Sequence, residues 1–127
     1  MEKISLLVGR VLLAHIFLIA GIGKITGYAG TQGYMEAMGV PGALLPLVIL
    51  AEVGGGLALI AGFLTRYAAW GLALFSVISA VIFHLDFSDP MQQILFMKNL
   101  AMAGGLIILA AVGAGALSLD ARSRWAL

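Results

Sequence analysis

The chain has 127 residues, of which 62% are hydrophobic and 10% are charged, and its formal net charge is +1. Because soluble domains carry roughly 25% charged residues, this composition and a mean hydropathy of +1.10 predict a membrane protein. The small net charge favours no nucleic-acid partner, and the absence of cysteine excludes thiol–disulfide exchange, thiolate metal sites and iron–sulfur ligation. The length allows one domain over residues 1–127, and the predicted fold class is all-α: an integral membrane bundle of four transmembrane helices.

The first predicted transmembrane helix covers about residues 4–25. No small-residue cleavage site follows it, so we interpret it as a retained helix rather than a signal peptide. Successive helical residues are rotated by ~100°, which places five residues on one narrow stripe: Arg10, Ala14, Phe17, Gly21 and Lys24. This stripe is expected to face the interior of the bundle.

The second predicted transmembrane helix, about residues 44–63, carries Glu52 near its midpoint. Before it, residues 26–41 are too polar to span, and we expect a loop with one interfacial helical turn at residues 34–38. A carboxylate within hydrocarbon is costly unless it is neutralised or paired, so a cation from another helix is expected beside Glu52. The glycine run at residues 54–56 predicts close packing of a neighbouring helix.

The third predicted transmembrane helix covers about residues 67–84 and ends at His84, and the fourth covers about residues 92–115 and carries Lys98 and Asn99. The basic residues of the tails and of the second loop are Lys3, Arg66, Arg122 and Arg124, whereas the first and third loops carry Glu36, Asp86 and Asp89. By the positive-inside rule, both termini are predicted to lie in the cytoplasm.

Arg10 and Lys98 are the cations expected to reach Glu52. With a rise of ~1.5 Å per residue, Arg10 approaches the depth of Glu52 from one side of the membrane and Lys98 from the other. The sequence therefore predicts a polar core of Arg10, Glu52 and Lys98, with His84 and Asn99 near its outer mouth. This core either fixes helix register only, or binds a ligand or relays protons, and no pattern of metal ligands accompanies it.

Three segments resemble a known family: GRVLLAHIFLIAGIGKITGY in the first helix, AEVGGGLALIAGFLTR in the second and FMKNLAMAGG in the fourth. In their order and spacing they resemble the DoxX family of small bacterial membrane proteins with four helices, over nearly the whole chain. The family pattern highlights Arg10, Phe17, Gly21, Lys24, Glu52, Gly55, Arg66, Lys98, Asn99 and Gly104.

The resemblance implies a multi-pass protein of the bacterial inner (plasma) membrane that is associated with quinone-linked oxidation. On this hypothesis the chain has no intrinsic cofactor, admits a quinone between its helices and acts with a redox partner subunit. Glu52 is the candidate catalytic residue, which accepts or passes a proton. The candidate ligand-binding residues are Arg10, Phe17, His84, Lys98 and Asn99.

The competing hypothesis is a non-enzymatic membrane scaffold, an assembly factor or a small-solute carrier whose polar core only fixes the helix register. Whether the chain belongs to an enzyme therefore stays open at this point. The lipid bilayer is a partner in either case, and small residues on the helix faces are compatible with a homodimer.

Overall fold

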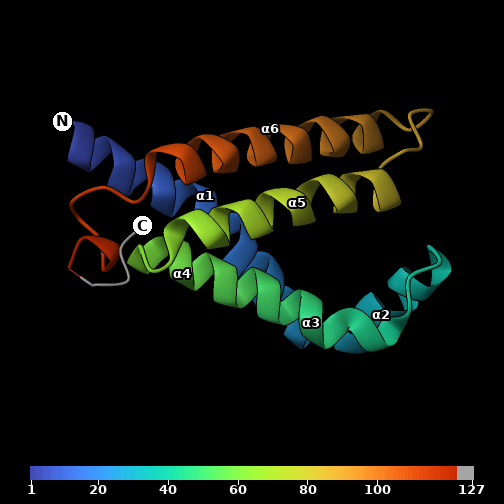
Figure 1. Cartoon of the computed structure of the whole chain (residues 1–127). Helices are drawn as coiled ribbons and strands as arrows, with labels where there is room; N and C mark the ends of the chain where they lie inside the picture. The colour runs from blue at the N-terminus through green and yellow to red at the C-terminus, as the bar shows by residue number, and fades with distance from the viewer. Residues whose placement is uncertain (123–127) are drawn as a thin grey trace.

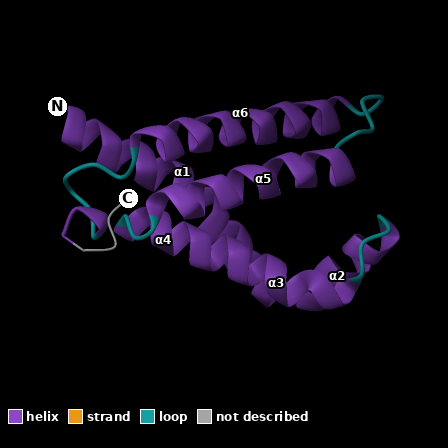
Figure 2. Ribbon diagram, in the orientation of Figure 1, coloured by secondary structure: helices purple, strands orange, loops and turns teal. Residues whose placement is uncertain are grey.

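The computed structural model describes residues 1–122, so Arg124, one of the cations behind the predicted orientation, lies outside the described residues. Within this range the regular structure is helical (Figure 2), and four helical spans are long and apolar enough to cross a membrane. Their bounds are Glu2–Thr26, Gly42–Ala61, Thr65–Phe83 and Pro90–Val112. The predicted all-α fold with four transmembrane helices is confirmed.

The first span is α1 (Glu2–Thr26), and the third and fourth are α5 (Thr65–Phe83) and α6 (Pro90–Val112). The second span is built from four consecutive segments: η1 (Gly42–Leu44), α3 (Leu45–Ile49), the π-helical η2 (Leu50–Gly54) and α4 (Gly55–Ala61). A further helix, α2 (Tyr28–Ala37), precedes the second span. The single helical turn predicted at residues 34–38 is therefore too short and begins too late.

The helices form two groups that α1 connects (Figure 1). α5 and α6 lie side by side as an antiparallel hairpin, α3 and α4 follow one another as a second rod, and α1 crosses behind and contacts η2 and α4. The N-terminus and the end of the described chain lie at one end of the bundle, which we call the termini end, and α2 lies at the opposite α2 end. The cytoplasmic location of the termini stays a prediction.

Local signals explain where the spans begin. Asp89 precedes α6, and its side chain accepts a hydrogen bond from the backbone nitrogen of Met91, while Pro90 occupies the first turn, where a missing amide hydrogen costs little. α6 therefore begins at Pro90 rather than at residue 92. Pro46 lies in the first turn of α3 for the same reason.

The core is made mainly of alanine and leucine from α1, α4, α5 and α6, with Phe17 as its aromatic member. The predicted inward stripe of α1 is confirmed, since its buried residues are Arg10, Ala14, Phe17 and Gly21. Small side chains let the helix axes come close, which is the main source of packing energy between helices in lipid.

Glycines bring α1 into close contact with the second span. A methyl group added at Gly21 would lie 2.6 Å from Val53 Cγ2 and 3.2 Å from Glu52 Cβ. A methyl group added at Gly56 would lie 3.1 Å from the backbone nitrogen of Leu18. The packing expected at the glycine run is therefore present, and Glu52 lies directly against α1.

Replacement of Gly21 by alanine tests this contact. We expect Gly21→Ala to lower the unfolding temperature in detergent, because forcing a methyl group into a packed interface costs about 1–3 kcal/mol. Gly23→Ala is the matched control, since a methyl group there meets no atom within 4 Å. The control should unfold at or above the temperature of the parent protein, because alanine has the higher helix propensity. Equal unfolding temperatures for the two variants would contradict the contact.

Candidate functional site

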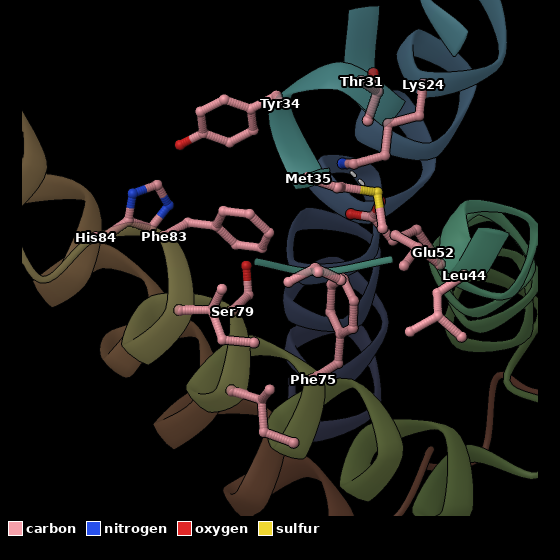
Figure 3. A pocket seen from close by; sticks show the side chains of 14 residues that line it. Lys24, Thr31, Tyr34, Met35, Leu44, Glu52, Phe75, Ser79, Phe83 and His84 are labelled. Atoms are coloured by element: carbon pink, nitrogen blue, oxygen red, sulfur yellow. Dashed lines mark ion pairs between the residues drawn. The ribbon is translucent and has the colours of Figure 1, made fainter. Parts of the chain in front are cut away.

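A cavity of about 400 Å³ lies at the α2 end, between the end of α1, α2, the second span and α5 (Figure 3). Its apolar lining residues are Tyr34, Met35, Val40, Leu44, Val48, Phe75, Ile78, Ile82 and Phe83. Its polar lining residues are Lys24, Thr31, Glu52, Ser79 and His84. Small-molecule sites typically have volumes of roughly 300–1,000 Å³, with mostly apolar walls and a few convergent polar groups. The cavity has both properties.

An ion pair between Lys24 and Glu52 forms part of the cavity wall. Lys24 Nζ lies 2.7 Å from Glu52 Oε1, and the two side chains are 29% and 5% exposed. This cation is the partner that a carboxylate in the middle of a transmembrane span requires. Lys24 lines the cavity together with Glu52 and retains more exposure than Glu52.

Lys24 reaches Glu52 although it lies near the end of α1. In a helix the Cα–Cβ bond tilts toward the N-terminus, so a long side chain covers the turn before its own residue. The residue one turn before Lys24 is Gly21, whose missing side chain leaves room for Glu52. The lysine side chain therefore extends back along α1 to the level of the carboxylate.

Glu52 lies at the centre of the π-helical segment η2 (Leu50–Gly54). A π-helical turn bonds residue i to residue i+5 and so holds more residues than an α-helical turn, which changes the direction of the side chains before and after it. Such segments are rare and frequently occur at functional sites. Here the π-helical segment presents the carboxylate to both α1 and the cavity.

Aromatic and polar contacts connect the helices at the mouth of the cavity. The rings of Tyr34 in α2 and Phe83 in α5 are stacked, with centroids 5.3 Å apart and planes inclined by 22°. His84 Nδ1 lies 2.7 Å from Gln92 Oε1, and because this amide oxygen accepts, Nδ1 donates. The rim residues Leu44 and Ile78 are 42% and 48% exposed, so the cavity reaches the surface that faces lipid.

The expected pairing of Arg10 with Glu52 is wrong, because Arg10 lies at the termini end and binds backbone carbonyl groups. Its guanidinium donates to Leu59 O at 2.7 Å, to Ile60 O at 3.3 Å, to Ala114 O at 2.6 Å and to Leu117 O at 2.9 Å. The final carbonyl groups of a helix have no partner within the helix and carry partial negative charge. Arg10 therefore joins the end of α4 to the segment after α6 and needs no carboxylate.

The segment after α6 makes a second connection at the termini end. The carboxylate of Asp120 accepts hydrogen bonds from the backbone nitrogens of Leu64 at 2.7 Å and Thr65 at 2.9 Å. Leu64 has a φ of 47°, a left-handed conformation that is unfavourable for leucine. Asp120 thus stabilises the strained turn between α4 and α5 and caps the first turn of α5.

Of the predicted site residues, Glu52 and His84 line the cavity and the other four do not. Phe17 is 3% exposed within the core, and Arg10 lies at the termini end. Lys98 is exposed on α6 and makes no ion pair within residues 1–122, so the expected contact between Lys98 and Glu52 is also wrong. Asn99 is its neighbour on α6, outside the cavity lining. We therefore leave these four residues outside the candidate site.

Sequence reasoning missed Lys24 as the partner of Glu52, although it had placed Lys24 on the inward stripe of α1. That stripe was the signal, because Gly21 and Lys24 lie one turn apart on the same face. The aromatic lining from Tyr34, Phe75 and Phe83 had no comparable signal, since Tyr34 lies in α2 and the two phenylalanines lie in α5, and the sequence does not specify the relative position of these helices.

The four spans and the internal ion pair define a small multi-pass membrane protein with a cavity at membrane depth. The sequence profile of the DoxX family matches residues 5–85, and the chain belongs to this family. It is 54% identical to inner membrane protein YqjF of Escherichia coli (strain K12) over 120 residues, which cover 94% of this chain and 92% of the relative. It is also 35% identical to inner membrane protein YphA of the same organism over 129 residues, with 95% and 91% covered.

No solved structure matches the chain significantly. The relatives and the four spans together place the protein in the inner membrane as a multi-pass protein.

The carbonyl contacts of Arg10 predict a structural role for this residue. We expect Arg10→Lys to lower the unfolding temperature markedly, because a lysine cannot reach the carbonyl groups of both α4 and the tail, and each buried polar group left unpaired costs about 1–3 kcal/mol. Arg122→Lys, at an exposed residue of η3 (Asp120–Arg122), is the matched control and should unfold like the parent protein. Thermal unfolding followed by circular dichroism makes the comparison, and indistinguishable variants would refute the assignment.

Proposed function

We propose that this protein is an accessory subunit of a quinone-linked redox system and that its cavity binds the ring of a quinone. The observation that carries the proposal is a cavity of about 400 Å³ with apolar walls and a single ion pair, Lys24–Glu52, at membrane depth. A quinone has the matching chemistry, because it combines a flat ring and an apolar tail with polar oxygen atoms. When bound, the quinone supplies the two-electron redox chemistry.

The lining residues fit the parts of such a ligand. Phe75, Tyr34 and Phe83 offer aromatic surfaces against which a ring can pack in offset or edge-to-face geometry. The ammonium of Lys24 would donate a hydrogen bond to a ring oxygen, and Glu52 would accept or pass a proton. The exposed rim at Leu44 and Ile78 would let the tail extend into the bilayer.

The proposal combines this geometry with the membership of the chain in the DoxX family. The resemblance of the sequence to that family suggests a link to quinones. The electron donor would be a partner subunit, so any enzymatic activity would belong to the complex. If the termini are cytoplasmic, the cavity lies in the outer half of the membrane.

The alternative, a scaffold, assembly factor or small-solute carrier, is favoured by the purely structural contacts of Arg10. This alternative requires no quinone in the cavity, so a binding measurement separates the two.

Filling the cavity tests the proposed function. The purified protein should bind a short-tailed benzoquinone in detergent, measured by isothermal titration calorimetry. Ser79→Phe, which places a ring inside the cavity, should weaken the affinity at least about tenfold, because a displaced ligand loses its buried contacts.

Val81→Phe is the matched control, because Val81 lies on the same helix, is 48% exposed and does not line the cavity. Its affinity should equal that of the parent protein. A parent protein that binds no quinone, or an affinity unaffected by Ser79→Phe, would argue for the non-enzymatic alternative.

A further inference from the structure

The ion pair leaves one carboxylate oxygen without a partner. Glu52 Oε1 is fully buried and lies 2.7 Å from Lys24 Nζ. Glu52 Oε2 is not among the fully buried atoms, and no side chain or backbone group of residues 1–122 donates a hydrogen bond to it. Figure 3 shows one carboxylate oxygen of Glu52 directed toward the centre of the cavity, on the same side as the ammonium of Lys24. The cavity wall therefore presents a free acceptor directly beside a donor.

A hydroxyl group complements this pair, whereas a carbonyl group does not. A hydroxyl oxygen accepts a hydrogen bond from Lys24 while its proton is donated to Glu52 Oε2, and a hydrogen bond to an ionised carboxylate is among the strong ones. A carbonyl oxygen accepts from Lys24 only. It leaves the carboxylate oxygen unsatisfied and brings a second negative oxygen close to it, which is unfavourable at low dielectric.

We infer that the cavity binds the dihydroxy, reduced form of its ligand more tightly than the dicarbonyl, oxidised form. This inference rests on the proposed function and adds to it the redox state that the site selects. A ligand in the cavity shields Oε2 from water, and an acceptor that is shielded without a donor is costly, so the hydroquinone is expected to bind about tenfold more tightly than the quinone.

Preferential binding of the reduced form has a consequence for the bound couple. Tighter binding of the product of reduction makes reduction more favourable, so the midpoint potential of the bound ligand rises above that of the ligand in lipid. For a two-electron couple each tenfold preference raises this potential by about 30 mV. The bound quinone would therefore accept electrons from the partner subunit more readily than the same quinone in lipid.

The test compares the two redox forms of one ligand on the full chain in detergent under anaerobic conditions. The dissociation constants of a decyl-substituted benzoquinone and of the corresponding hydroquinone are measured by calorimetry for the parent protein, Glu52→Gln and Glu36→Gln. The amide of Glu52→Gln can donate to a carbonyl group, so the preference for the hydroquinone should disappear or reverse. Glu36 is an exposed carboxylate on α2 outside the cavity lining, so Glu36→Gln should retain the preference.

Each outcome has a separate meaning. A tighter hydroquinone complex in the parent protein that Glu52→Gln abolishes supports the inference. Equal affinities, or tighter binding of the quinone by the parent protein, overturn the inference and leave the proposed function standing. Absence of binding for both forms overturns the proposed function itself. If Glu52→Gln does not fold, the comparison within the parent protein still decides.

Discussion

The high cost of an unpaired charge in hydrocarbon is the constraint on which this structure depends. Arg10 and Glu52 are the charged groups buried in the spans, and a residue of α1 takes part in the pairing of each. Arg10 binds carbonyl groups at the termini end, and Lys24 binds Glu52 toward the α2 end. The two cations lie on the same stripe of α1, separated by the close contact at Gly21. One helix face thus determines how the second span and the tail pack.

The two ends of the bundle differ as a result. At the termini end, Arg10 and Asp120 join α1, α4, the turn before α5 and the tail through hydrogen bonds to backbone groups. At the α2 end, the second span and α5 are separated by the cavity, and the stacked rings of Tyr34 and Phe83 connect α2 to α5. Regions held by few buried contacts open at lower free energy than densely connected ones. Access to the cavity is therefore expected at the α2 end.

The fold was predictable from sequence because the membrane restricts the solutions to apolar helices of sufficient length, and the stripe of α1 follows from helical periodicity alone. The site was only partly predictable. Treating each helix as a straight rod paired Glu52 with Arg10 and Lys98 by depth, whereas the direction of the Lys24 side chain and the π-helical segment around Glu52 decide the actual partner. The composition of the cavity depends on how α2 and α5 approach each other, which no local pattern in either helix specifies.

Comparison of the two buried charges distinguishes a structural role from a binding role. Arg10 makes hydrogen bonds to carbonyl oxygens from two parts of the chain, is 2% exposed and does not line the cavity at the α2 end. A group that only fixes register is expected to be satisfied in this way, because an unused donor or acceptor would cost stability. Glu52 instead has a single cation as its partner, lies in a π-helical segment and borders a cavity open to lipid. Its incomplete satisfaction is the physical reason to expect that a ligand completes the site.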